Sequence, residues 1–197
     1  MLIDITQEVF SGKVYPGDTP PRRKLVSSLE EGAACSVTDF SMCAHNGTHA
    51  DAPSHYVRGG KGADLLDLNK CVGLCEVRTF SGPISKAELR SLRAPRLLVK
   101  GGNLFTAEEA ALLCECCVLV GTENQTVGDG RVHRILLERE VVVLEGLSLG
   151  GAEDGLYELY ALPMKLGGAD GAPVRAVLKT LGAAGEEAAR AGKEETR

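Results

Sequence analysis

Alternating or continuous runs of apolar residues recur along the chain, and they predict β-strands. Some runs alternate apolar and polar positions, as a half-buried strand does, and others are apolar throughout, as a strand buried on both faces is. The predicted strands lie at residues 2–10, 23–31, 34–43, 75–80, 96–100, 116–121, 141–146, 156–166 and 174–181.

Helical patterns are fewer and shorter than the strand patterns. The segment SKAELRSL begins with Ser85, which can cap a helix while Glu88 completes a capping box. The segment TAEEAALL has the same pair in Thr106 and Glu109. A third helix is predicted in RVHRILLERE, directly after Gly130.

The order of these elements indicates the fold class. Strands and helices interleave from about residue 75 onward, whereas the first 45 residues contain predicted strands alone. This order favours a strand-rich α/β domain over a purely doubly wound sheet. With 197 residues, of which 44% are hydrophobic, we expect a single domain over residues 1–183. Residues 184–197 are rich in charge and poor in large apolar side chains, so we expect a charged C-terminal tail.

Charge and composition exclude several classes of partner. The formal net charge is -5, so no basic field favours a nucleic-acid backbone or an anionic membrane. The first ten residues lack the basic and apolar regions of a signal peptide, and no apolar run approaches the roughly 18 residues of a membrane span. We therefore expect a cytoplasmic protein that binds neither nucleic acid nor membrane.

Seven cysteines raise the question of disulfide bonds or a zinc finger. Their number is odd, and no paired C-x-x-C spacing occurs. Three of them, Cys114, Cys116 and Cys117, lie in the apolar stretch ALLCECCVLV, where cysteine behaves as a small hydrophobic residue. Reduced and mostly buried thiols are the favoured interpretation.

The candidate chemistry is concentrated in residues 45–55, which read HNGTHADAPSH. Three of the four histidines of the chain, His45, His49 and His55, lie there beside Asp51. Neutral imidazoles and a carboxylate are ligands that zinc and manganese accept. Glycine and proline in the segment indicate a shaped loop, so backbone turning would bring these side chains together. The competing interpretation is ordinary turn chemistry in a polar loop.

Two more residues qualify as ligands of a second metal position. His133 lies in the predicted helix RVHRILLERE, and Glu145 ends the apolar strand VVVLEG. A carboxylate at the point where an apolar strand stops can reach into a cleft without crossing the core. One such carboxylate and one imidazole are what a second metal would need beyond the histidine loop.

The segment HNGTHADAPSH resembles the H-x-G-T-H-x-D-x-P-x-H motif of the cyclase family, which contains bacterial kynurenine formamidases and isatin hydrolases. Every fixed position of the motif is matched. Three further segments, VYPGDTP (14–20), GTENQTVGDG (121–130) and LPMKLGGADGAPVRAVL (162–178), look like family segments. The resemblance therefore covers the chain to about Leu181. It implies a swivelling β/β/α domain that forms a homodimer or a higher homo-oligomer.

The resemblance also implies a role for each site residue. It makes His55 the general acid/base, and it makes Asp51 a ligand that bridges two metal positions. The other implied ligands are His45 and His49 at the first position, and His133 and Glu145 at the second. The step from His133 to Glu145 matches the family's spacing for this pair. The implied cofactor is zinc or manganese, with one or two ions per chain.

Two positions depart from the formamidases of the family. The formamidases usually have tryptophan before P-G-D, where this chain has Tyr15 and no tryptophan anywhere. By its position, Tyr15 is the expected substrate contact. In the turn after G-T, Glu123 takes the place of a common aspartate.

The resemblance implies a metal-dependent hydrolase of carbon–nitrogen bonds other than peptide bonds. The favoured activity is that of an arylformamidase, which converts N-formylkynurenine to kynurenine and formate. The first alternative is hydrolysis of isatin or of another small cyclic amide. The second is a metal-binding regulatory protein without turnover, and His55 favours catalysis over it because this residue has no necessary ligand role.

Overall fold

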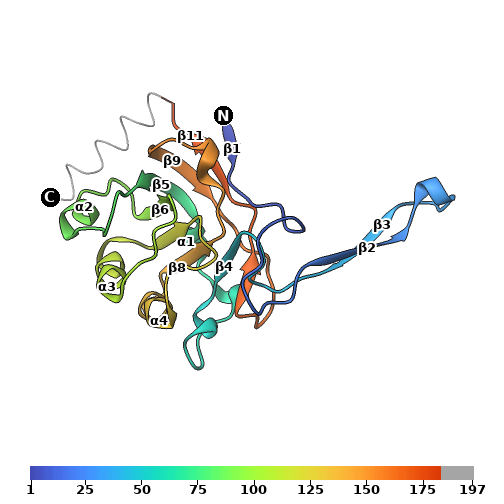
Figure 1. Ribbon diagram of the computed structural model, residues 1–197, viewed down its shortest axis with the longest axis horizontal. Coiled ribbons are helices and arrows are strands. Elements are labelled where there is room, and N and C mark those ends of the chain that lie inside the picture. The colour runs from blue at the N-terminus through green and yellow to red at the C-terminus, as the bar shows by residue number, and fades with distance from the viewer. Residues whose placement is uncertain (183–197) are drawn as a thin grey trace.

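The computed structural model describes residues 1–182, and the predicted tail at 184–197 lies outside the described residues (Figure 1). The strands are β1 (Leu2–Asp4), β2 (Arg22–Ser27), β3 (Val37–Ser41), β4 (His49–Asp51), β5 (Val72–Thr79), β6 (Arg96–Lys100), β7 (Leu119–Thr122), β8 (Val142–Glu145), β9 (Gly155–Tyr160), β10 (Gly171–Pro173) and β11 (Val177–Thr180). The helices are α1 (Leu68–Cys71), α2 (Lys86–Arg90), α3 (Ala107–Cys116) and α4 (Gly130–Glu138).

Nine of these strands form one sheet in the order β1-β11-β9-β5-β6-β7-β8-β4-β10. The four central strands, β5 to β8, are parallel neighbours, and every other pairing in the sheet is antiparallel. Parallel neighbours need a crossover connection, and α2, α3 and α4 provide one between each successive pair. The prediction of a strand-rich α/β fold is confirmed.

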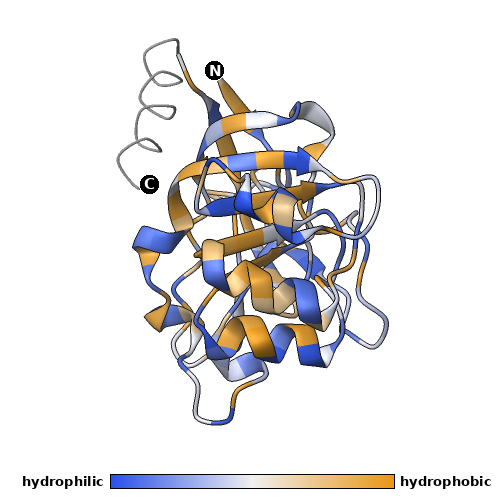
Figure 2. Ribbon diagram, turned by 90° about the vertical axis from the view of Figure 1, so that its left-hand side faces the viewer, coloured by the Kyte–Doolittle hydropathy of each residue, from blue (hydrophilic) through white to orange (hydrophobic). Residues whose placement is uncertain are grey.

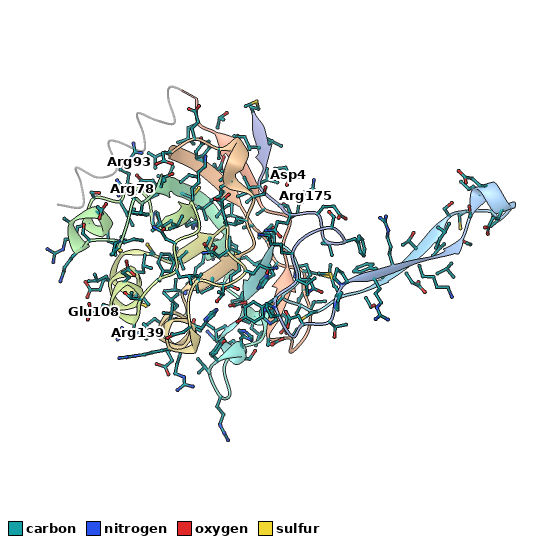
Figure 3. The ribbon with its side chains drawn as sticks, in the orientation of Figure 1. Asp4, Arg78, Arg93, Glu108, Arg139 and Arg175 are labelled. Atoms are coloured by element: carbon teal, nitrogen blue, oxygen red, sulfur yellow. The ribbon has the colours of Figure 1, made fainter. Side chains whose placement is uncertain are left out.

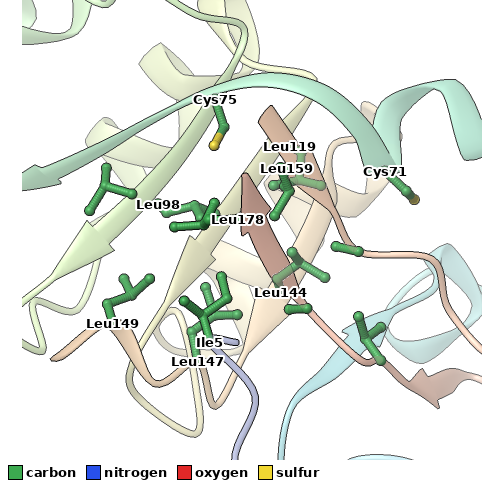
Figure 4. Close-up of a cluster of buried hydrophobic side chains, with 14 of the residues drawn as sticks. Ile5, Cys71, Cys75, Leu98, Leu119, Leu144, Leu147, Leu149, Leu159 and Leu178 are labelled. Carbon is green, nitrogen blue, oxygen red and sulfur yellow. The ribbon is translucent and has the colours of Figure 1, made fainter. Parts of the chain in front are cut away.

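Two hydrophobic cores lie on opposite faces of the parallel strands. In β6 the side chains alternate, so Leu97 and Val99 contact the helices while Leu98 faces the other way. The helices cover one face of the sheet, as Figure 2 shows. On the opposite face Leu98 belongs to a cluster with Leu159 and Leu178, from strands that are not its neighbours in the sheet (Figure 4). The sheet is therefore strongly curled, and it packs against itself.

A two-stranded arm, formed by β2 and β3, projects from this body (Figure 1). Most of the arm stands away from the rest of the molecule (Figure 3), and at its base Arg23 lies over the Phe10 ring, 5.1 Å from the ring centre. On the body itself, an ion pair joins Asp4 of β1 to Arg175, which precedes β11. The arm exposes five large apolar side chains, Leu25, Val26, Leu29, Val37 and Phe40. An isolated two-stranded hairpin is marginally stable in water, so the pairing of β2 with β3 alone contributes little to the stability of the arm.

All nine predicted strands and all three predicted helices have a counterpart in the structure, with the predicted bounds for β6 and shifted bounds for the others. The predicted strands at 2–10 and 156–166 were too long, because β1 ends at Asp4 and β9 ends at Tyr160. Among the described residues, the short elements α1, β4 and β10 and four 3-10 helices of three residues each were not predicted. The histidine segment is therefore not wholly a loop, since its central residues form β4.

The cysteines and the helices bear on two further predictions. All seven cysteines are free, but three are buried, three are partly buried and Cys35 is exposed, so the prediction of mostly buried thiols was too strong. None of the helices within residues 1–182 has the length and apolar character that crossing a bilayer requires.

Candidate metal centre

Strand β4 carries the first two site residues on one face. Because side chains alternate along a strand, His49 and Asp51 point the same way, while Ala50 between them is fully buried in the opposite core. The antiparallel register with β8 places His49 directly opposite Glu145. One imidazole and two carboxylates thus meet on two neighbouring strands.

Close backbone contact between two glycines holds the start of β4 beside the end of β8. Gly47 and Gly146 both have a φ of 65°, a left-handed conformation that favours glycine. A side chain on Gly146 would collide with the carbonyl oxygen of Gly47. The Thr48 hydroxyl donates a hydrogen bond to the carbonyl of Gly146, which fastens the same junction.

Helix α4 contributes His133 from its first turn. Asp129 caps this helix, and its carboxylate accepts hydrogen bonds from the backbone N–H groups of Arg131 and Val132. The carbonyl of Asp129 lies 2.9 Å from His133 Nδ1 and accepts its hydrogen. The other nitrogen, Nε2, is 3.0 Å from Glu145 and 3.6 Å from Asp51.

His49 has the same arrangement of its two ring nitrogens. Its Nδ1 lies 3.0 Å from the carbonyl of Gly47, which can only accept a hydrogen bond. Its buried Nε2 lies 3.4 Å from Asp51 Oδ1 and 3.4 Å from Glu145 Oε2, and it has no hydrogen-bond partner. A backbone acceptor at Nδ1 that leaves Nε2 free is the usual orientation of a metal-binding histidine.

The other two histidines lie on the more open side of the cluster. His45 follows β3 and places Nδ1 3.0 Å from Asp51 Oδ1. His55 ends a short 3-10 helix, Pro53–His55, and its ring stacks on that of His45 with 4.2 Å between the ring centres. A side chain on Gly171 would approach His45 Cε1 to 2.7 Å, so glycine at this position makes room for the ring.

Asp170 is a site residue that sequence reasoning missed. Its Oδ2 lies 3.1 Å from His45 Nε2 and 3.2 Å from His55 Nδ1. It directly precedes β10, which pairs with β4 so that Gly171 lies opposite Asp51. The local signal was an aspartate between glycine-rich turns in GGADGAP, within a segment that resembles the family.

The donor set fits a divalent cation. Two groups of three residues each place one ligand atom per residue within 4.8 Å of the others, and Asp51 belongs to both groups: His45, Asp51 and His55, and His49, Asp51 and Glu145. Asp51 is fully buried, and its Oδ2 has no hydrogen-bond partner. An unpaired buried carboxylate oxygen is costly, and a cation bound there would remove that cost.

The electrostatics of the cluster agree with this fit. Burial disfavours charge on His49, but the Asp51 and Glu145 carboxylates outweigh it and raise the pKa of His49 to about 10. Burial likewise opposes ionisation of Asp51, but the hydrogen bond from His45 and the neighbouring His49 imidazole hold the pKa of this carboxyl far below its usual range. The site therefore stabilises positive charge at its centre.

A cavity of about 200 Å³ opens onto these residues. The Tyr56 ring forms part of its wall and stacks on that of His133, with 4.6 Å between the ring centres. Tyr15, the predicted substrate contact, lines the same cavity. Through Tyr15, Gln125 and Thr126 the cavity adjoins a larger open groove of about 760 Å³.

Every site residue that the sequence predicted lies at this one place. His55, Tyr15 and three of the predicted ligands, His45, His133 and Glu145, line the cavity. The other two, His49 and Asp51, lie buried behind it and contact those ligands. His55 lies close enough to His45 and Asp51 to be a third ligand of the same ion. Distances therefore do not decide whether His55 is a ligand or a proton-transfer group, and measuring metal content together with turnover does.

The fold and the cluster define a curled α/β protein with a candidate centre for a divalent metal. Comparisons with known proteins give its family. The model of the family described as "Putative cyclase" matches residues 3–124. The kynurenine formamidase of Erythrobacter litoralis (strain HTCC2594) is 32% identical, over 92% of this chain and 95% of that protein. The chain belongs to the cyclase family.

Solved structures agree with this assignment. A structure titled as a potential metal-dependent hydrolase with cyclase activity superposes with a TM-score of 0.75 at 26% identity, over 90% of this chain and 96% of that one. Isatin hydrolase A from Labrenzia aggregata, bound to benzyl benzoate, superposes with a TM-score of 0.76 at 22% identity, over 90% of this chain and 93% of that one. The latter shows a shared fold.

We expect the stability of chelator-treated protein to fall as the pH rises from about 6.5 to about 10. His49 has a folded pKa above its ordinary 6.5, so its contribution is complete below 6.5 and is lost as the pH rises through about 10. Asp51 has a lowered pKa, so its contribution is lost only as the pH falls below its ordinary 3.8. Asp51 therefore does not change the stability in this range, and thermal unfolding between pH 6.5 and 10 measures the effect of His49.

The control is the same protein saturated with zinc. Metal binding needs deprotonated imidazoles, so added zinc should stabilise the protein more as the pH rises. Stability of the chelator-treated protein that stays level or increases between pH 6.5 and 10 would contradict the electrostatic description of His49.

Proposed function

We propose that this protein is a metal-dependent arylformamidase that hydrolyses N-formylkynurenine to kynurenine and formate. The observation that carries the proposal is the convergence of four histidines and two carboxylates at a cavity, with buried His49 Nε2 and Asp51 Oδ2 atoms that lack a partner. The family relatives named kynurenine formamidase support the substrate class.

The proposed ligands divide between two positions that share Asp51. His45 and His49 complete the first position, and His133 and Glu145 complete the second, for one or two ions of zinc or manganese. A bound divalent cation supplies a water of pKa near 7 and polarises the carbonyl oxygen of the substrate. Backbone carbonyls hold two of these ligands in place, because they accept hydrogen bonds from Nδ1 of His49 and of His133.

His55 is the proposed general acid/base. It lines the cavity, its side chain is 27% exposed, and only its Nδ1 is engaged, by Asp170. In hydrolysis a water adds to the formyl carbon, and the bond from that carbon to the aryl nitrogen breaks. His55 takes a proton from the water and returns it to the departing nitrogen, so formate and an arylamine leave and the imidazole is regenerated.

The cavity walls suit an aryl substrate that carries a tail. Tyr15 and Tyr56 present aromatic surfaces beside His55, and aromatic rings pack well on one another. The adjoining groove continues past Tyr15 and gives room for a polar extension of the ring. A small bicyclic amide such as isatin carries no extension that would enter that groove.

Substrate choice is tested with metal-replete protein and a panel of N-formylkynurenine, formanilides and isatin. We expect the two formamide classes to be hydrolysed with a higher kcat/KM than isatin, because their cleaved bond is an open formamide. A higher kcat/KM for isatin would replace this proposal with a cyclic-amide hydrolase. A metal-loaded protein that hydrolyses none of the panel would indicate a metal-binding regulatory protein.

The roles of individual residues are tested by measuring metal and turnover on the same preparations. We expect wild-type protein purified without chelator to hold zinc or manganese at one to two equivalents. His49→Ala should lose metal and activity together. His55→Ala should keep its metal and lose about 10²- to 10⁴-fold in kcat, the usual contribution of a positioned proton-transfer group.

Cys117→Ser is the control. Cys117 is buried in the core on the helix side of the sheet, so its substitution should leave the metal content unchanged. A metal-loaded His55→Ala enzyme with wild-type kcat would remove the proposed acid/base, and metal loss in Cys117→Ser would show a wrong ligand set.

We further propose that the protein forms a homodimer or a higher homo-oligomer through the arm of β2 and β3. The arm exposes Phe40 to 57% and Val37 to 43% beside three more large apolar side chains, far more apolar surface than a free hairpin needs. The proposed partner of the arm is a second copy of this chain, because a second copy is always present at the concentration of the protein itself. The arm joins the site directly, since β3 ends four residues before His45.

Light scattering coupled to size exclusion tests this assembly. We expect wild-type protein to elute as a dimer or larger, and Phe40→Lys to shift toward the monomer, because a buried charge is costly at an apolar interface. Leu68→Lys is the matched control, since Leu68 is 54% exposed on α1 in the body. A monomeric wild type, or a Phe40→Lys protein of unchanged mass, would contradict the proposal.

A further inference from the structure

Asp170 contacts two imidazoles through one oxygen. Its Oδ2 lies 3.1 Å from His45 Nε2 and 3.2 Å from His55 Nδ1, and the rings of these two histidines stack at 4.2 Å. The function proposed above notes the contact of Asp170 with His55 but assigns this carboxylate no role.

The backbone holds Asp170 in place from both sides. Its carbonyl accepts a hydrogen bond from Ala52 N at 2.9 Å, and the carbonyl of Ala169 accepts one from Ala63 N at 2.8 Å. One residue further, Gly171 begins β10 in register with Asp51. The carboxylate therefore has a position fixed by the sheet, although its side chain is 50% exposed.

A carboxylate only accepts hydrogen bonds, so each nitrogen that faces Asp170 carries a hydrogen. His55 is then the tautomer with hydrogen on Nδ1, which leaves a lone pair on Nε2 to accept a proton. Both ring nitrogens of His45 face carboxylates, Nε2 that of Asp170 and Nδ1 that of Asp51, so without a cation both carry a hydrogen. A bound cation would take the place of the hydrogen on Nδ1, and Nε2 would still donate to Asp170. The same oxygen thus selects a basic atom on one ring and a ligand atom on the other.

We propose that Asp170 is a positioning residue that sets the tautomer and orientation of His55 and His45 together, and so couples proton transfer to metal binding. The proposal rests on the function proposed above. Asp170 keeps its own charge throughout: the proton that His55 takes from water goes onto Nε2 and then to the departing nitrogen. The carboxylate stabilises the imidazolium that exists between these two transfers.

The first test observes the tautomer without any substrate. The chain has only four histidines, so ¹⁵N-histidine NMR of the zinc-loaded protein resolves each ring, with His55→Ala to assign one of them. We expect hydrogen on Nδ1 of His55 in the wild type. In Asp170→Asn the amide can donate as well as accept, so the His55 tautomer should shift toward hydrogen on Nε2.

The second test is kinetic. Asp170→Asn should lose about 10²- to 10⁴-fold in kcat with little change in KM, since a wrong tautomer removes the proton acceptor and leaves substrate contacts intact. The loss should be smaller for formanilides with electron-withdrawing rings, whose nitrogen departs with less need of a proton. Asp170→Glu keeps a carboxylate and should recover part of the activity.

The third test measures zinc affinity by competition with a chelator, which needs no turnover. Loss of the hydrogen bond to a ligand histidine typically weakens metal affinity about 10- to 100-fold, and we expect that range for Asp170→Asn. Asp64→Asn is the matched control, because Asp64 accepts a hydrogen bond from Gly168 N in the same loop and touches neither imidazole. It should match the wild type within about twofold.

An unchanged His55 tautomer in Asp170→Asn overturns the proposal, as does an equal loss in Asp64→Asn, which would assign the effect to the loop. If the wild type hydrolyses no formamide, the function proposed above fails, while the tautomer and zinc measurements still decide the role of Asp170.

Discussion

The register of β4 between β8 and β10 is the constraint on which the site depends. It places His49 opposite Glu145 on one side and Asp51 opposite Gly171 on the other. A slip of one residue would turn both site side chains into the core and Ala50 into the cavity. The fully buried Ala50 and the close contact of Gly47 with Gly146 oppose such a slip, because neither site has room for a larger group.

The same register concentrates charge where the protein can least solvate it. Asp51 is fully buried and Glu145 nearly so. Their negative charges are balanced by protonated imidazoles, or would be balanced by a cation in place of those protons. With His49 as the proposed ligand, the two states would compete for the same atom, since Nε2 can hold a proton or a metal but not both. Stability of the fold and occupancy of the site are therefore linked through this pair of strands.

Much of the fold was predictable because its long segments carry their own periodicity. The parallel strands β6, β7 and β8 were found from continuous apolar runs, and α2 and α3 from capping boxes that the structure contains. The three-residue strands β4 and β10 have no such signal, because pairing partners far along the chain define them. Seven site residues were predicted from clustering and from the family resemblance, whereas Asp170 reaches His55 only through that distant pairing, 115 residues away.

The sheet also explains why the site has two unequal halves. Glu145 ends a parallel strand, and His133 lies in the first turn of the helix that follows the neighbouring parallel strand, so both belong to the carboxyl ends of the α/β region, where ligands collect in such folds. His45, His49 and Asp51 come instead from the antiparallel edge. Two contacts join the halves: Asp51 lies 3.0 Å from His45 and 3.6 Å from His133, and His49 lies 3.4 Å from Glu145. A change in either half therefore reaches the other through these two neighbouring residues of β4.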